Sequence, residues 1–259
     1  MSTSIEKAKA SKVKVAFFDF SSCEGCQIEL TNLGEEVFTG LLQHLEFVEF
    51  REVMTETAKG PIDIAFIEGA FTREADRKRL EDIRARSKTV ISFGACASTG
   101  GITALKNHMS DYSQCVYGVN SGAPHLASQK SEPISAAIKV DYAIHGCPMD
   151  KDEFVYIVSH LLHGKEPVIP NHPVCVECKM RETVCRYSYG HHCMGLVARA
   201  GCGAPCPADG IPCEACRGFI EHPNEESLTK VMNERGRMTS ERAKNKSRMF
   251  TATLRGDAK

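Results

Sequence analysis

The sequence contains no tryptophan, few aromatic residues (7%) and no excess of charge, with 32 Lys and Arg against 33 Asp and Glu. A near-neutral chain lacks the basic field that holds nucleic-acid phosphates, so no nucleic-acid partner is expected. No apolar run approaches the ~20 residues of a membrane-spanning helix, so no transmembrane segment is expected. Residues 1–12 carry Glu6 among three lysines and no apolar stretch typical of an export signal, which predicts a cytoplasmic protein.

Cysteine is what the sequence has in excess, with 13 residues in a chain of 259. Structural disulfides are rare in a reducing compartment, so crowded cysteines there indicate metal binding or redox chemistry. The sequence contains no Gly-x-Gly-x-x-Gly fingerprint for a dinucleotide, so flavin or nicotinamide chemistry would belong to partner chains.

Apolar runs alternate with helical patterns along the first part of the chain. Strands are predicted at residues 13–20, 46–53, 62–67, 89–93 and 140–144, and helices at 27–45, 72–86, 132–138 and 150–163. Continuous apolar runs such as VKVAFFDF are typical of strands that are buried on both faces. The alternation therefore predicts an open, mostly parallel α/β sheet. The Gly- and Ser-rich residues 98–131 are predicted to form a long irregular loop.

Composition changes after Gly164 and divides the chain into residues 1–165, 166–222 and 223–259. The second segment holds eight cysteines but few large apolar side chains, so burial of apolar surface alone cannot fold it, and bound metal is the obvious candidate to stabilise it. From Lys230 onward the chain has nine Lys and Arg against three Asp and Glu. We expect this third segment to be a solvated or disordered tail, or alternatively a docking strip for an acidic partner.

Four cysteines come from distant parts of the first segment and follow predicted strands. They are Cys23, Cys26, Cys96 and Cys147. Ligand sites of open α/β sheets lie outside the carboxyl ends of the strands, so these thiols should meet at one edge. Gly25, Gly94 and Gly146 lie close to them, where a bulky side chain would hinder backbone approach. An iron–sulfur cluster fits this set, and a structural zinc ion or a thioredoxin-like Cys-x-x-Cys pair are the alternatives.

The remaining cysteines of the second segment fall into two sets of four. One set is Cys175, Cys178, Cys185 and Cys193, and the other is Cys202, Cys206, Cys213 and Cys216. Two iron–sulfur clusters and two zinc sites fit this spacing equally well. Cys115 is left over, and we expect no ligand role for it.

Several motifs resemble those of [NiFe]-hydrogenase small subunits, in particular their cytosolic, multi-subunit branch. They are SCEGCQ at residues 22–27, GACA at 94–97 with Gly100-Gly101, GCP at 146–148, PVCVECK at 173–179, AGCGAPCP at 200–207 and GIPCEACRG at 210–218. The resemblance covers about residues 13–218, and the order of the motifs is specific.

This resemblance implies a flavodoxin-like domain followed by a small irregular iron–sulfur domain, with three [4Fe–4S] clusters. The implied ligands are Cys23, Cys26, Cys96 and Cys147 for the proximal cluster, Cys202, Cys206, Cys213 and Cys216 for the medial, and Cys175, Cys178, Cys185 and Cys193 for the distal. Exported relatives use a histidine at the distal cluster and a three-iron medial cluster, and this chain departs from both patterns. Cys193 and Cys202 could exchange places between the two clusters.

The resemblance also implies partners. The Ni–Fe centre would lie on a separate large subunit, so this chain holds no catalytic residue and relays electrons to further iron–sulfur or flavin subunits. The terminal acceptor could be NAD(P), deazaflavin, ferredoxin or a heterodisulfide. The alternatives are the cluster-bearing subunit of a complex I-like quinone oxidoreductase, which has adjacent cysteines in its first motif, and a zinc-stapled interaction protein.

Overall fold

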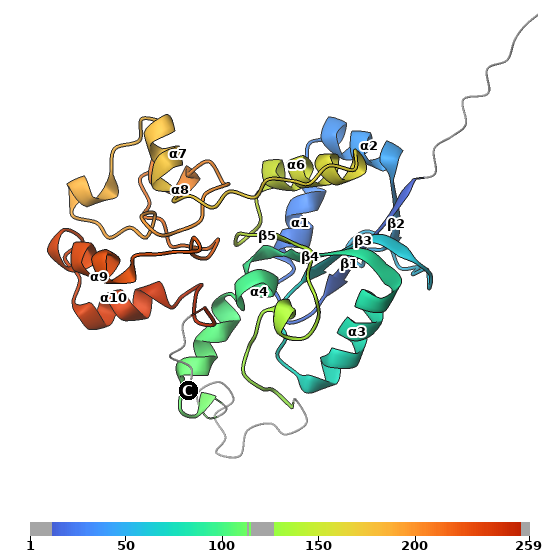
Figure 1. Ribbon diagram of the computed structural model, residues 1–259, viewed down its shortest axis with the longest axis horizontal. Helices are drawn as coiled ribbons and strands as arrows, with labels where there is room; N and C mark the ends of the chain where they lie inside the picture. Colours follow the sequence, from blue (N-terminus) through green and yellow to red (C-terminus); the bar gives the residue numbers. More distant parts are fainter. Residues whose placement is uncertain (1–11, 113, 115–126, 255–259) are drawn as a thin grey trace, which may run out of the picture.

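The computed structural model describes residues 12–112, 114 and 127–254. A five-stranded sheet of order β2-β1-β3-β4-β5 lies between two layers of helices (Figure 1). Its elements are β1 (Val13–Asp19), α1 (Gly25–Thr31), α2 (Glu35–His44), β2 (Leu45–Glu49), β3 (Ile62–Glu68), η1 (Glu74–Asp76), α3 (Arg77–Arg86), β4 (Ser87–Phe93), α4 (Gly94–Thr99), η2 (Ile102–His108), η4 (Ile134–Ala136), β5 (Tyr142–Ile144) and α6 (Lys151–Leu162). The four strand pairs are parallel and the order is flavodoxin-like, which confirms the predicted fold class.

Burial on both faces explains why the strands are continuously apolar. Phe17 belongs to a core with side chains of α1 and α6, while its neighbour Phe18 belongs to a core with side chains of α3 and α4. Successive residues of a strand point to opposite faces, so each face of β1 needs its own apolar side chains.

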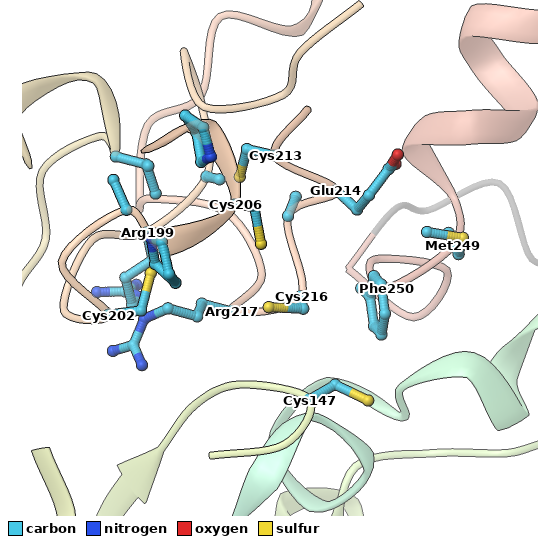
Figure 2. Close-up of a pocket in the computed structure, with 16 residues that line it drawn as sticks. Cys147, Arg199, Cys202, Cys206, Cys213, Glu214, Cys216, Arg217, Met249 and Phe250 are labelled. Carbon is cyan, nitrogen blue, oxygen red and sulfur yellow. The ribbon is translucent and has the colours of Figure 1, made fainter. Parts of the chain in front are cut away.

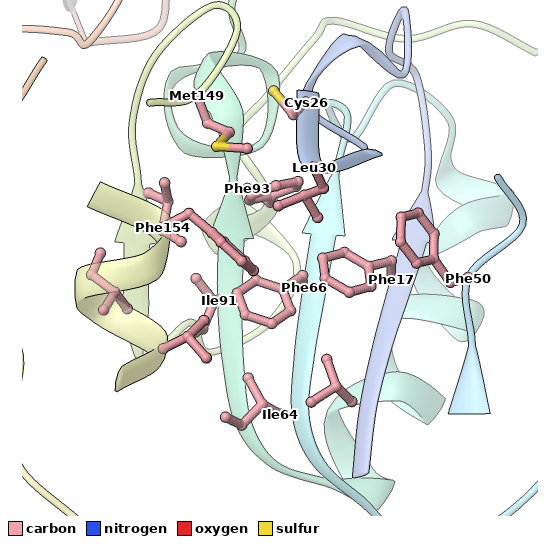
Figure 3. Packing of buried hydrophobic residues seen from close by; sticks show 14 of the residues in the cluster. Phe17, Cys26, Leu30, Phe50, Ile64, Phe66, Ile91, Phe93, Met149 and Phe154 are labelled. Atoms are coloured by element: carbon pink, nitrogen blue, oxygen red, sulfur yellow. The ribbon is translucent and has the colours of Figure 1, made fainter. Parts of the chain in front are cut away.

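Phenylalanine rings form the centre of the first of these cores (Figure 3). The ring of Phe17 stacks on Phe66 with centroids 4.7 Å apart, and Phe66 meets Phe93 edge to face at 5.6 Å. Cys26 and Met149 lie above these rings, toward the carboxyl ends of β3 and β4 (Figure 3). The aromatic core thus supports the edge of the sheet from which the first cysteines project.

Several predicted elements differ in the structure. The strand expected over residues 46–53 ends at Glu49, and the helix expected over 132–138 is only the short 3-10 helix η4. The helix expected over residues 27–45 is two helices, α1 and α2, because the chain turns at residues 32–34, where Gly34 has an extended backbone. The expected loop over 98–131 contains the end of α4 and the whole of η2, and Asn107 ties η2 to Ser131 by two hydrogen bonds of 2.8 Å. Cys115 and the first eleven residues lie outside the described residues.

The residues after α6 form a second lobe beside the sheet (Figure 1). Its elements are α7 (Cys175–Met180), η5 (Arg186–Tyr189), α8 (Pro205–Ala208), α9 (Glu225–Glu234) and α10 (Ser240–Ser247). In the described part of the chain, no helix combines the length and the apolar character that a membrane crossing requires.

As far as residue 254, where the described residues end, the basic C-terminal segment is not the solvated or disordered tail expected from its composition. Leu228 and Met232 of α9 and Ala243 of α10 are buried in one apolar cluster with Val174 and Met194. Asn224 and Thr239 cap the two helices through their side chains, and each helix has glutamate in its first turn. These capping residues are the helix-start signals that the charge count concealed.

The carboxylate of Asp141 provides a test of how the last strand is attached to the sheet. Burial tends to raise its pKa, but hydrogen bonds from the Val90 N–H at 2.9 Å and from Arg84 hold the pKa below its usual range. A lowered folded-state pKa stabilises the protein at pH values above the unfolded pKa of about 3.9. Asp141→Asn should therefore cost about 1–2 kcal/mol at neutral pH.

The pH dependence of this loss follows from the same shift. Because Asp141 remains ionised throughout, the difference in unfolding midpoint between wild type and Asp141→Asn should stay constant from pH 8 to pH 5. Thermal unfolding at one scan rate measures it, with the exposed Asp82→Asn as a control expected to change little. The difference should shrink only as the pH falls below about 4, because the stabilisation by the ionised carboxylate is lost as the pH falls through the folded-state pKa. A difference that does not decline there would show that the pKa is not lowered.

Candidate metal centres

The first four cysteines meet at the carboxyl edge of the sheet, as the strand pattern predicts. Cys23 precedes α1 and Cys26 lies in its first turn, Cys96 lies in α4 directly after β4, and Cys147 follows β5. The four residues line one cavity of about 130 Å³. Cys26 is buried, whereas Cys23 and Cys147 are exposed. This cavity therefore gathers four thiols from three strand ends at the surface of the lobe.

Glycines make room for these sulfur atoms. A Cβ at Gly94, where φ is +84°, would lie 2.4 Å from the Cys26 Sγ, and one at Gly101 would lie 2.9 Å from the Cys96 Sγ. A side chain at either position would displace a thiol, and both backbones favour glycine. The cavity is thus a cradle shaped around four sulfur atoms, and its donor set suits a thiolate-bound metal cluster.

Glu68 supports this cradle and was not identified from the sequence. Its side chain is buried and accepts hydrogen bonds from the backbone N–H groups of Cys26 at 3.3 Å and Gln27 at 3.2 Å. Burial raises the pKa of Glu68, and these hydrogen bonds oppose the shift. The carboxylate orients the first turn of α1 and with it the Cys26 thiol. An acidic residue at the end of the apolar run IDIAFI was the signal available in the sequence.

The second lobe gathers the last four cysteines around a larger cavity. Cys202, Cys206, Cys213 and Cys216 line a cavity of about 260 Å³, which also reaches Cys147 of the first group (Figure 2). Burial raises the pKa of Cys202 to about 11, and the Cys216 thiolate adds to the rise. The structure therefore brings together the four residues expected to hold the medial cluster.

The other four cysteines of this lobe form a group of their own beside the medial group. Cys175 and Cys178 belong to α7, Cys185 precedes η5, and Cys193 is buried. Burial raises the pKa of Cys175 to about 11. The negative charges of the Cys193, Cys178 and Cys185 thiolates raise this pKa further, by smaller amounts. These four residues are thus near neighbours, as the distal grouping requires.

The three groups adjoin one another. Cys147 of the first group lines the same cavity as Cys216 of the medial group, and the Cys213 N–H donates a hydrogen bond to the Cys193 Sγ at 3.4 Å. In the described chain, no three His, Cys, Asp or Glu side chains stand close enough to hold a single metal ion. The thiols instead form three wider groups in series, with the medial group between the other two.

A buried ion pair fastens the second lobe to the sheet. Arg217 follows Cys216, and its guanidinium donates two hydrogen bonds to the carboxylate of Glu153 on α6, at 2.6 and 2.7 Å. The two side chains are only 2% and 5% exposed. Arg217 also donates to the backbone oxygens of His145 and Ala200, both at 2.9 Å. One side chain therefore links the loop before Cys147 to the loop before Cys202.

Comparison with known proteins identifies relatives of this arrangement. Residues 23–161 match the family described as NADH ubiquinone oxidoreductase, 20 Kd subunit. The delta subunit of sulfhydrogenase 2 from Pyrococcus furiosus is 32% identical, over 86% of this chain and 93% of that protein. One subunit of the F420-non-reducing hydrogenase vhu from Methanocaldococcus jannaschii is 33% identical, over 80% of this chain and 82% of that protein.

Solved structures share the fold. A chain of an NAD+-reducing [NiFe]-hydrogenase in the H2-reduced state superposes with a TM-score of 0.53 and 24% identity, over 62% of this chain and 96% of that chain. A chain of the H2-activated [NiFeSe]-hydrogenase of Dm. baculatum superposes with a TM-score of 0.56 and 14% identity, over 84% of this chain and 98% of that chain. The shared fold includes most of both lobes in the second case.

Proposed function

The chain belongs to the family of the NADH ubiquinone oxidoreductase 20 kDa subunit and is, within it, an electron-transfer subunit of a hydrogenase; we propose that it relays electrons through three [4Fe–4S] clusters. The clusters would connect the Ni–Fe centre of a separate large subunit to a partner acceptor. The complex would interconvert H2 with two protons and two electrons, and this chain would supply no catalytic residue.

The serial arrangement of the three thiol groups is the observation that carries this proposal. The proximal ligands would be Cys23, Cys26, Cys96 and Cys147, the medial ligands Cys202, Cys206, Cys213 and Cys216, and the distal ligands Cys175, Cys178, Cys185 and Cys193. When bound, an iron–sulfur cluster takes up and releases an electron at a potential set by its ligands, hydrogen bonds and solvent exposure. The twelve described cysteines are all free thiols, which leaves each of them available as a ligand.

The residues of this chain have distinct tasks in such a relay. Glu68 orients the Cys26 end of the proximal site, and the backbone N–H of Cys213 donates to the Cys193 sulfur of the neighbouring group. Hydrogen bonds to sulfur raise the potential of a cluster and fix the position of its ligand. The exposed edge at Cys23 and Cys147 would face the large subunit, and the distal group would face further iron–sulfur or flavin subunits.

The terminal acceptor and the compartment complete the proposal. The relatives carry names that refer to different acceptors, among them NAD and coenzyme F420, and NAD(P), deazaflavin, ferredoxin or a heterodisulfide could serve here. We place the complex in the cytoplasm because free thiols in this number suit a reducing compartment. Mass spectrometry of the co-purifying subunits would identify the acceptor.

Metal analysis of anaerobically purified protein tests the number of clusters. We expect about twelve iron atoms and as many acid-labile sulfides per chain, because each set of four cysteine thiolates holds one [4Fe–4S] cluster. The protein should be brown, with broad absorbance at the edge of the visible range. Iron well below twelve per chain would contradict the three-cluster relay, and a colourless protein loaded with zinc would indicate the interaction protein considered above.

The complex I-like alternative predicts a different result from the same measurement. Such a subunit would hold a single cluster on adjacent cysteines, which corresponds to about four iron atoms. Here two residues separate Cys23 from Cys26, and eight further cysteines follow in two compact groups. The second lobe therefore favours the hydrogenase relay.

A further inference from the structure

The chain turns back across both lobes after α10 ends at Ser247. Met249 and Phe250 line the cavity of the medial cysteines, and Thr251 and Ala252 are completely buried. The Thr253 hydroxyl then donates a hydrogen bond of 2.7 Å to the carbonyl oxygen of Thr99, the last residue of α4. We call residues 249–253 the C-terminal cover. It contacts the lobe that holds the medial cysteines and the helix that carries Cys96.

Phe250 lies at the junction between the proximal and medial groups. Figure 2 shows its ring between α10 and the loop of Cys147, on the side of the cavity where Cys216 also lies. Only 6% of Phe250 is exposed, so its ring fills the space that water would otherwise enter. The C-terminal cover also packs tightly against the first lobe. A Cβ added at Gly100, directly after α4, would lie only 2.8 Å from the Thr253 Cγ2.

The helix before the cover is itself anchored to the medial motif. Glu214 lies between Cys213 and Cys216. Its Oε1 atom forms an ion pair with the Nζ of Lys246 of α10 at 2.9 Å and lies within hydrogen-bond distance of the His192 Nε2 at 3.0 Å. Ala243, one turn earlier in α10, is buried in the apolar cluster of the second lobe. The position of the cover is thus set from both ends, by Lys246 before it and by Thr253 within it.

We propose that the C-terminal cover excludes water from the space between the proximal and medial cysteines and thereby keeps the reduction potential of the medial cluster low. This inference rests on the relay function proposed above. A cluster bound by four thiolates is anionic and gains negative charge on reduction. Water stabilises the more highly charged state, so an apolar cover disfavours reduction. Phe250 is accordingly a positioning and shielding residue that binds no iron.

Phe250→Ala tests this in the full chain within its hydrogenase complex, purified without oxygen. A redox titration followed by electron paramagnetic resonance should show the medial potential shifted to more positive values. Iron release to a chelator should become several-fold faster. Phe250→Leu keeps an apolar side chain in place, and Leu254→Ala changes a residue that is 50% exposed and outside the cavity lining. Both controls should resemble the wild type in potential and in iron release.

Thr253→Val provides a second variant in case Phe250→Ala does not fold. It removes the hydrogen bond to Thr99 and preserves the shape of the side chain, and it should shift the potential in the same direction by a smaller amount. Loss of the medial iron alone in either variant would also support the proposed shielding role of the C-terminal cover. An unchanged potential and unchanged iron release in the folded variants would overturn it. A wild-type complex that contains no iron in this chain would instead refute the proposed function.

Discussion

Arg217→Met is expected to lower the free energy of unfolding by about 3–5 kcal/mol, because it leaves the carboxylate of Glu153 buried without its partner. Arg217 donates two hydrogen bonds to Glu153, and both side chains are at most 5% exposed. The substitution also removes the donor that satisfies the carbonyl oxygens of His145 and Ala200. Since Arg217 joins the second lobe to the sheet, the loss should loosen the junction between the proximal and medial cysteines.

The apparent unfolding midpoint of the anaerobic protein measures this effect. At about 2–4 °C per kcal/mol for a chain of this size, the midpoint should fall by roughly 6–20 °C. The double variant with Glu153→Met should recover much of the loss, because an apolar pair of similar volume carries no uncompensated charge. Arg77→Met, which breaks an exposed pair with Glu74, should cost at most about 1 kcal/mol. Equal losses in the single and double variants would contradict a role for charge pairing.

Gly94→Ala is expected to abolish cluster binding at the proximal cysteines. The added Cβ would lie 2.4 Å from the Cys26 Sγ, and the backbone φ of +84° is itself unfavourable for alanine. The Cys26 sulfur would have to move out of the cavity that it shares with Cys96 and Cys147. About four of the twelve or so iron atoms should therefore be lost, because a cluster needs all four thiolates in place.

Gly40→Ala is the matched control for this substitution. Gly40 lies within α2, and a Cβ there would meet no atom within 4 Å. Alanine should leave the iron content unchanged and stabilise the helix by about 0.5–1 kcal/mol. Iron and sulfide analysis of the two variants, prepared side by side, makes the comparison. Full iron content in Gly94→Ala would show that the cavity is not the cluster site.

The pattern of apolar residues predicted the central strands well, because burial on both faces of the sheet determines which residues they contain. Strands buried on both faces are continuously apolar, so β1, β3 and β4 were found within two residues of their ends. The single helix predicted across Gly34 was wrong because periodic apolar residues continue on both sides of the turn. The prediction of a solvated tail was wrong because it relied on the high charge of the segment, whereas α10 also contains buried residues such as Ala243.

The meeting of Cys23, Cys26, Cys96 and Cys147 could be predicted because each of them follows the carboxyl end of a predicted strand. Parallel strands end at one edge of a sheet, so residues that directly follow β1, β4 and β5 must meet. The two later sets lie in motifs short enough for their members to remain neighbours. The assignment of Cys193 and Cys202 stayed open in the sequence. Cys193 lies at the border between two groups, because the Cys213 N–H donates to the Cys193 Sγ.

The sequence by itself determined the number of thiols and the sheet edge where the first set lies, and it predicts their division into three sets of four. These properties depend on residue type, spacing and strand ends, which are local. Only the tertiary structure decided what joins and shields the sets. Arg217 and Glu153 are 64 residues apart, and Thr253 and Thr99 are 154 residues apart. Such pairs depend on how the two lobes pack against each other. The spacing of apolar residues within either segment carries no information about that packing.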